Sequence, residues 1–381
     1  MKNKIFSFLF VFFCVTVAFS QNKEKTKAPS SYQNTEFHTD YKPNYKNDGL
    51  NKPVKNVILL IGDGMGLAQA SAGMYANHNT LTIFNLKNIG LIKTFSLSDF
   101  ITDSAASGTA YATGEKTKNG CIGVDSLGNK LPNMTEILSP LGYATGIVTT
   151  DKITGATPSA FYAHQIKRNM TKEILEDLVN TKALFIAGSS VKDFEKNNTE
   201  KLDALKKKNF KVLHDYKNLP LSMEAEKIAL ICDDMNAKFI SEGRNPNYLK
   251  ETTAQAIKFL SNKSKKGFFL MVEGAQIDWA SHNNVIENVI REVLDFDKAV
   301  EEALKFADKN GETLVIITAD HETGGMSLSN GNIEKAHFAT SGHSPIMVPV
   351  YAYGPQAQLF RGVQDNTEIF SKILSALQVK K

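Results

Sequence analysis

The stretch Val57–Gly66 reads VILLIGDGMG, and the rest of the chain is best understood from it. A continuous apolar run that ends at glycine is typical of a strand buried on both faces of a parallel sheet. Ligands of open α/β sheets bind just beyond the carboxyl ends of the strands, which is where Asp63 stands. Its flanking glycines let the backbone turn sharply and approach a ligand. Alone, however, Asp63 is equally well explained as an ordinary turn carboxylate.

Three later stretches repeat this layout, in which acidic and imidazole side chains follow an apolar run. They are Phe268–His282, Leu314–His321 and the segment around His343. Because the carboxyl ends of parallel strands meet at one edge of a sheet, we expect these stretches to converge there.

Short apolar runs alternate along the chain with segments whose apolar residues recur at helical spacing. We expect strands at 57–61, 90–96, 143–150, 183–187, 228–231, 268–272, 313–318 and 349–353. We expect helices at 133–141, 158–167, 171–179, 200–208, 247–262, 284–310 and 367–377, and surface helices and loops within the Lys-rich segment 192–227. This alternation predicts a single-domain α/β fold, with a large, mostly parallel sheet sandwiched between helices.

The N-terminus is predicted to be a signal peptide, residues 1–20, because Lys2 and Lys4 precede an apolar run that ends at small residues. The run is too short for a membrane span, so a periplasmic or secreted protein is expected. Residues 21–52 contain few aliphatic side chains and are predicted to be an N-terminal arm or linker, which leaves 53–381 for the folded domain. A net charge of +4 without a basic stripe gives no case for nucleic-acid binding.

Beyond the predicted signal peptide the chain contains two cysteines, Cys121 and Cys232. Two cysteines permit one disulfide in an oxidising compartment, or they remain separate thiols, and the sequence leaves both alternatives open. They are too few for a cysteine-rich zinc site.

A possible nucleophile lies in residues 102–110, which read TDSAASGTA. Thr102 or Asp103 can cap a helix that begins near Ser104. A hydroxyl group at a helix N-terminus faces free N–H groups and the positive end of the helix dipole, which favours its alkoxide. A plain helix cap explains the same residues.

Candidate metal ligands occur in three segments. Residues 273–282 read EGAQIDWASH, and Asp278 and His282 share a face if this segment is helical. Residues 318–325 read TADHETGG and residues 341–344 read SGHS, which adds further acidic and imidazole side chains. Oxygen and nitrogen ligands together suit zinc, whereas carboxylate and hydroxyl oxygens suit magnesium. Each side chain alone is explained as a loop or core residue, but their shared position after strands argues for one site.

The motifs GDGMG, TDSAA, VEGAQID and TADHETGG, in this order, resemble those of the alkaline phosphatase family, and the resemblance runs from about Lys55 to Leu377. Residues 53–381 are therefore interpreted as an alkaline-phosphatase-like catalytic domain. This resemblance implies a nucleophile, two zinc sites, a magnesium site and a phosphate-binding arginine. They fall on Ser104 as nucleophile and metal ligand; Asp63, Asp320 and His321 for the first zinc; Asp278, His282 and His343 for the second; Asp63, Glu273 and Thr157 for magnesium; and Arg168, held by Asp103, for the phosphate.

The resemblance implies hydrolysis of phosphate monoesters through a phosphoserine, with two Zn²⁺ and one Mg²⁺, in a homodimer. Two zinc ions about 4 Å apart can clamp the attacking and leaving oxygens of an in-line displacement. A bidentate arginine matches the oxygens of a phosphate group. On local sequence alone, Arg168 is better explained as a solvated charge after the predicted helix 158–167.

Two positions depart from the family pattern. Gly155 stands where relatives often carry Asp or His near the magnesium shell, and Trp279 where some carry Lys or His. These departures leave the third ion open.

Two alternatives remain: a phosphodiesterase or sulfatase of the same superfamily, and a phosphate- or metal-binding protein without turnover. The residues around Ser104 do not resemble a sulfatase motif, and Glu273, Thr157 and Arg168 favour the monoesterase. The intact nucleophile argues against a protein without turnover.

Overall fold

The computed structural model describes residues 37–195, 199–233, 237–329 and 336–380. The predicted signal peptide and the first part of the predicted arm lie outside the described residues.

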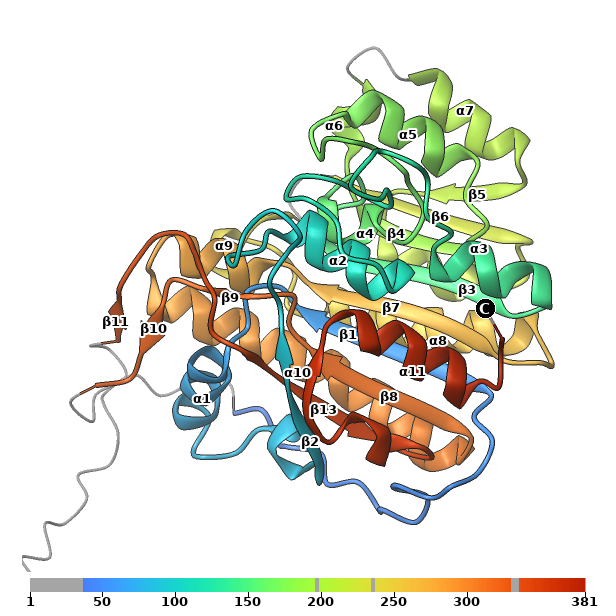
Figure 1. The fold of residues 1–381 in the computed structure, drawn as a ribbon. Coiled ribbons are helices and arrows are strands. Elements are labelled where there is room, and N and C mark those ends of the chain that lie inside the picture. Colours follow the sequence, from blue (N-terminus) through green and yellow to red (C-terminus); the bar gives the residue numbers. More distant parts are fainter. Residues whose placement is uncertain (1–36, 196–198, 234–236, 330–335, 381) are drawn as a thin grey trace, which may run out of the picture.

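The core is a ten-stranded sheet with helices on both faces (Figure 1). Its strand order is β14-β2-β13-β8-β1-β7-β3-β4-β6-β5. The strands are β1 (Asn56–Gly62), β2 (Asn88–Lys93), β3 (Ala144–Lys152), β4 (Phe185–Ser189), β5 (Phe210–Leu213), β6 (Lys227–Cys232), β7 (Phe268–Gly274), β8 (Thr313–Thr318), β13 (Val348–Tyr353) and β14 (Gly362–Asp365). Among the described strands of this sheet, only β13 pairs antiparallel with its neighbours, so the predicted mostly parallel sheet is confirmed.

The first strand, β1, lies in the middle of the sheet between β7 and β8. All of its residues are buried, as its continuous apolar sequence predicts. In this register Ile61 lies opposite Glu273 on one side and Thr318 on the other. The chain therefore leaves three adjacent strands at the same edge of the sheet.

Two layers of helices bury the faces of the sheet. The helices α1, α8 and α10 pack together on one face, while α2, α4 and α11 lie on the other (Figure 1). The helices are α1 (Leu67–Ala76), α2 (Ser104–Thr113), α3 (Met134–Leu138), α4 (Ala156–Ser159), α5 (Thr171–Val179), α6 (Val191–Glu195), α7 (Thr199–Lys207), α8 (Tyr248–Lys263), α9 (Gln276–His282), α10 (Ile286–Asn310) and α11 (Thr367–Ala376). Two small antiparallel pairs lie beyond β8, namely β9 (Glu322–Thr323) with β12 (His343–Ser344) and β10 (Met326–Ser327) with β11 (His337–Phe338).

The predicted helix 158–167 is wrong. Only α4 is helical there, and Gln165 pairs with Ile122 in an isolated bridge. The apolar residues Phe161 and Tyr162 are buried in a turn, and the Tyr162 hydroxyl donates to the carbonyl of Ile153, 2.7 Å away. The apolar residues of this segment recur at helical spacing because the turn that contains them is buried, and not because they form one face of a helix. Arg168 consequently lies in a turn.

The segment 37–52 runs along the domain. The Nε2 atom of His38 lies 2.9 Å from a carboxylate oxygen of Asp297 in α10. Further along α10, Asp308 accepts hydrogen bonds from the Tyr41 hydroxyl at 2.6 Å and from the N–H of Asn44 at 3.0 Å. These contacts tie this segment to the helix layer behind the sheet.

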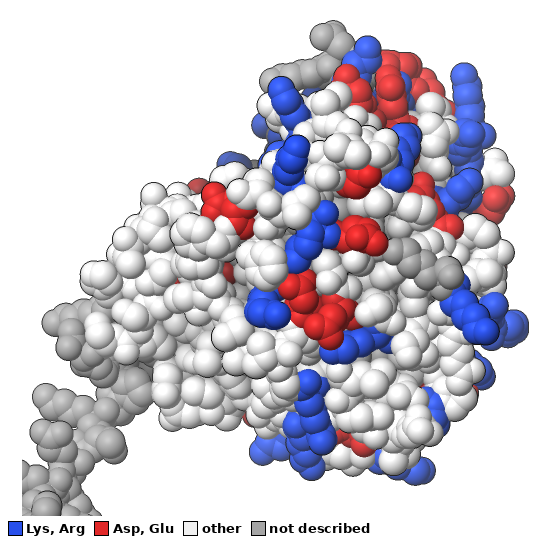
Figure 2. Space-filling model, viewed as in Figure 1, with Lys and Arg blue, Asp and Glu red and all other residues white. Residues whose placement is uncertain are grey.

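Three other features bear on the sequence-based expectations. None of the helices in the described ranges has both the length and the apolar character that a bilayer crossing requires. Cys121 and Cys232 form no disulfide with each other. On the face shown in Figure 2, basic and acidic side chains are interspersed and do not form a continuous basic surface.

Candidate metal centre

The carboxyl ends of four neighbouring strands, β8, β1, β7 and β3, bring acidic side chains together. Asp63 follows β1 directly, and Asp320 follows β8 after one intervening residue. Glu273 lies near the end of β7, and the helix α9 that follows carries Asp278 and His282 one turn apart. The edge of the sheet that the sequence pattern indicated is therefore the place where these carboxylates meet.

The helix α2 holds Ser104 against this edge. Ser104 is its first residue, and the Asp103 side chain caps the helix by accepting from the N–H of Ala106 at 3.0 Å. One turn later, the Ser107 hydroxyl donates to the carbonyl of Asp320 at 2.7 Å. The cap and this contact fix the Ser104 hydroxyl at the positive end of the helix dipole.

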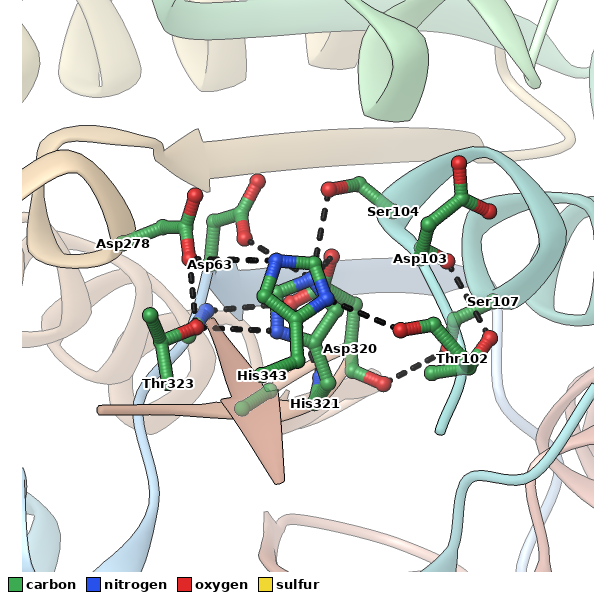
Figure 3. Close-up of polar contacts among 12 residues, drawn as sticks. Asp63, Thr102, Asp103, Ser104, Ser107, Asp278, Asp320, His321, Thr323 and His343 are labelled. Atoms are coloured by element: carbon green, nitrogen blue, oxygen red, sulfur yellow. Dashed lines mark hydrogen bonds and ion pairs between the residues drawn. The ribbon is translucent and has the colours of Figure 1, made fainter. Parts of the chain in front are cut away.

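A first cluster consists of Asp63, Asp320 and His321, all buried, which come from the ends of β1 and β8 (Figure 3). The Nε2 atom of His321 lies 3.5 Å from Asp63 Oδ1 and 3.2 Å from Asp320 Oδ2. It also lies 3.2 Å from the Oγ atom of Ser104. Neither carboxylate oxygen has a hydrogen-bond partner among the described residues.

A second cluster consists of Asp278, His282 and His343. The Nδ1 atom of His343 lies 2.8 Å from the carbonyl of Thr102, and that of His282 lies 2.6 Å from the carbonyl of Ser341. Because a carbonyl only accepts, each Nδ1 carries the proton and each Nε2 presents a lone pair. These two Nε2 atoms face each other at 3.2 Å.

The hydroxyl group of Thr323 links the two clusters (Figure 3). It donates to Asp278 Oδ1 and lies 3.2 Å from Nδ1 of His321. Because its proton goes to the carboxylate, the hydroxyl accepts from His321, which leaves the Nε2 lone pair of His321 directed at the first cluster. A single buried hydroxyl thus sets the orientation of ligands in both clusters.

Both clusters fit zinc. In each, imidazole and carboxylate lone pairs converge with no proton to share between them, an arrangement that a cation relieves. Imidazoles whose second nitrogen donates to a carbonyl or hydroxyl group are typical of zinc ligands.

The pKa values of the carboxyl groups in the two clusters depend on burial and on the charges beside them. Burial and then Asp320 raise the pKa of Asp63 well above its usual value. Burial and then Asp278 raise the pKa of Asp320 to about 6. For Asp278, burial opposes ionisation, but the adjacent His282 and the nearby imidazoles of His321 and His343 lower the pKa to about 2. Asp63 and Asp320, packed together without a cation, therefore resist ionisation, whereas Asp278 beside the imidazoles ionises readily.

A third group of oxygens lies beside the first cluster. One small pocket is lined by Asp63, Ser104, Asp151, Ala156, Thr157, Arg168, Glu273, Asp278 and Trp279. The Thr157 hydroxyl is buried and has no hydrogen-bond partner among the described residues. Burial and then Asp151 raise the pKa of Glu273 to about 8. Hydroxyl and carboxylate donors without nitrogen suit a hard cation such as magnesium.

The pocket opens at Arg168 and Trp279. The Arg168 side chain is 43% exposed, and its Nη1 atom donates to Asp103 Oδ2 at 3.2 Å. The same oxygen of Asp103 accepts from the N–H of Gly120 at 3.0 Å. Trp279 is 50% exposed. The cap of α2 therefore also holds the guanidinium group beside Ser104.

The sequence pattern missed three residues of this region and placed one wrongly. Asp151 lies near the end of β3, where the rule of acids after strands would have found it, whereas no sequence signal marks Thr149 or Thr323. His343 does not follow a strand of the large sheet. It lies on β12, which pairs with β9 just beyond β8.

Comparison with known proteins gives a consistent result. The family model described as alkaline phosphatase matches residues 54–337. Alkaline phosphatase 3 of Bacillus subtilis (strain 168) is 32% identical, with 87% of this chain and 91% of that protein covered. Alkaline phosphatase of Escherichia coli (strain K12) is 31% identical, with 86% and 87% covered.

Among solved structures, alkaline phosphatase from the Antarctic bacterium TAB5 superposes with a TM-score of 0.82 at 39% identity, covering 87% of this chain and all of that one. A variant of that enzyme with a histidine replaced by aspartate, described with Mg bound in the M3 site, superposes with a TM-score of 0.81. The fold, the family model and the relatives agree, and the chain belongs to the alkaline phosphatase family of phosphomonoesterases.

Proposed function

We propose that this chain hydrolyses phosphate monoesters through a phosphoserine on Ser104, with two zinc ions and one magnesium ion. Asp63, Asp320 and His321 hold the first zinc beside Ser104, while Asp278, His282 and His343 hold the second. The observation that carries the proposal is the 3.2 Å approach of Ser104 Oγ to the Nε2 lone pair of His321, within the first cluster.

The residues of the chain divide the work as follows. Ser104 Oγ attacks phosphorus, the ester P–O bond breaks, and the alcohol leaves. Water then cleaves the phosphoserine, which releases phosphate and restores the hydroxyl group. The N-terminus of α2 favours the serine alkoxide. Arg168, oriented by Asp103, holds the non-bridging oxygens of the phosphate. When bound, the zinc ions supply Lewis acidity to the attacking and leaving oxygens.

Magnesium is proposed for the third site, where Asp63, Glu273 and Thr157 offer only oxygen atoms. The unpartnered hydroxyl of Thr157 supports this assignment because a buried hydroxyl without a partner is unfavourable. The magnesium described in the M3 site of the Antarctic variant is in keeping with it.

The cellular setting rests on the sequence. The pattern of residues 1–20 supports export to the periplasm or the medium, where the signal peptide is removed. A homodimer is expected from the family resemblance. Cleavage at Gln21 is tested by N-terminal sequencing of the exported protein, and the dimer by light scattering.

The Ser104→Ala variant tests the nucleophile. We expect it to retain zinc and to bind inorganic phosphate but to lose nearly all turnover of an aryl phosphate. Ser71→Ala, which removes an exposed hydroxyl from α1, is the matched control and keeps parental activity. If Ser104→Ala hydrolyses the monoester as fast as the parent, the phosphoserine mechanism is wrong.

Substrate class is tested by comparing an aryl phosphate with a bis-aryl phosphate. The guanidinium of Arg168 and the third group of oxygens favour a dianionic monoester. A higher kcat/KM for the monoester is expected, and a preference for the diester would assign the chain to the phosphodiesterases.

A further inference from the structure

We propose that Asp151 supplies the carboxylate of the third-ion site that Gly155 cannot provide, which makes this an all-oxygen site for Mg²⁺ built from three carboxylates and one hydroxyl group. The inference rests on the proposed function, because it concerns the third ion of the same centre. In this proposal, one carboxylate ligand of the third ion comes from the end of β3 and not from the loop at residue 155.

The sheet places Asp151 beside the other donors. The strand β3 pairs with β7, and Thr149 lies opposite Glu273 in this register. The pairing of β3 with β4 becomes irregular between Val148 and Lys152, and such irregularities re-aim side chains near active sites. Asp151 lies within this irregular stretch, two residues beyond the position opposite Glu273.

A hydrogen-bonded bridge connects Asp151 with Glu273. The Thr149 hydroxyl donates to Glu273 Oε2 and accepts from the N–H of Asp151 at 2.8 Å. The side chain of Asp151 lines the same pocket as Asp63, Thr157 and Glu273. Three carboxylates from neighbouring strand ends therefore face one small space.

The local space, and not the backbone conformation, favours glycine at residue 155. Its φ of −57° is open to any residue. A Cβ atom at this position, however, would lie only 2.6 Å from Asp151 Oδ2, and 2.9 Å from the carbonyl oxygen of Lys152. A side chain at 155 and the carboxylate of Asp151 thus compete for the same volume. In this chain Asp151 occupies it.

An independent observation points to a ligand in this space. Thr157 is 1% exposed, and although its hydroxyl lies near enough to Glu273 to affect that carboxyl group, Oγ1 forms no well-aligned hydrogen bond among the described residues. A hard divalent cation is the ligand that a hydroxyl and several carboxylates jointly select, because no nitrogen or sulfur atom is offered.

The test uses the full mature protein loaded with zinc and titrated with Mg²⁺ by calorimetry, together with metal analysis. Asp151→Asn keeps the shape of the side chain and removes its charge. We expect two zinc equivalents as in the parent and a Mg²⁺ affinity lowered by about tenfold to a hundredfold. Asp203→Asn, which removes an exposed carboxylate from α7, is the control and leaves Mg²⁺ affinity unchanged.

A second variant returns the carboxylate to residue 155. The double variant Asp151→Ala/Gly155→Asp removes the nearer of the two obstacles to a side chain at 155, and a small shift of the Lys152 carbonyl then admits the new carboxylate. We expect this variant to recover Mg²⁺ affinity. If Asp151→Asn binds Mg²⁺ like the parent, the inference is wrong. Parental Mg²⁺ affinity combined with weaker phosphate binding would also refute the inference. In that case Asp151 would act on Arg168, which lines the same pocket.

The two proposals fail differently. An Asp151→Asn protein with parental Mg²⁺ affinity, two zinc ions and monoesterase activity refutes the role of Asp151 alone. A zinc-loaded parent that hydrolyses no monoester refutes the proposed function.

Discussion

Replacement of Thr323 by valine tests whether one hydroxyl group organises both zinc clusters. Valine keeps the β-branched shape in β9 and removes only the hydroxyl that contacts Asp278 and His321. The hydrogen bond to the Asp278 carboxylate is charge-assisted, a type that contributes about 1.5–3 kcal/mol. Since 1.4 kcal/mol corresponds to about a factor of ten, zinc affinity is expected to fall by about tenfold to a hundredfold in both clusters.

The assay is zinc content after dialysis against buffers of graded free zinc, followed by hydrolysis of an aryl phosphate. The matched control is Thr253→Val. Thr253 is also buried, in α8, but its hydroxyl has no hydrogen-bond partner among the described residues. The control is expected to hold zinc like the parent. Parental zinc retention in Thr323→Val, or loss from one cluster only, would refute the linking role of this hydroxyl.

Three further perturbations have defined outcomes. Gly64→Ala should lose zinc and stability, measured by metal analysis and thermal unfolding, because Gly64 has a φ of +70° and the new Cβ would lie 2.8 Å from the Cα of Asp278. Arg168→Lys should weaken inhibition by inorganic phosphate about tenfold without lowering Tm, because the lost contact is one charge-assisted hydrogen bond of a 43% exposed side chain. In metal-free protein, burial raises the pKa of Glu273 from 4.5 to about 8, so its stabilising contribution is complete below pH 4.5 and is lost as the pH rises through 8. Glu273→Gln should flatten this part of the pH dependence of Tm, and an unchanged slope would contradict the assignment.

The sequence predicts well the helices that bury one face and the strands that are buried on both faces. The helix α5 matches its predicted range, 171–179, because apolar residues follow its inner face. The central strands were found because they are continuously apolar. The edge strands β5 and β14 were missed, since they are short and partly exposed and their sequences carry little of that pattern.

The site shows a similar division. Acidic residues directly after apolar strands, such as Asp63 and Asp320, follow from the geometry of parallel sheets. The segment around His343 was predicted from the pattern but lies on the small pair β9–β12 and not after a strand of the large sheet. The role of Arg168 was implied only by the family resemblance, because its place depends on a turn. Thr323 gave no signal, since the importance of its hydroxyl arises only when distant segments meet.

The central place of β1 has a consequence for how the molecule folds. The first strand of the chain is completed only by β7 and β8, so Val57 must wait for Phe269 and Leu314 before its backbone is paired. Closing such long loops slows folding, and the pairs of β1 cannot form before β7 and β8 have been synthesised. The middle of the sheet is therefore completed only when the last third of the chain is present.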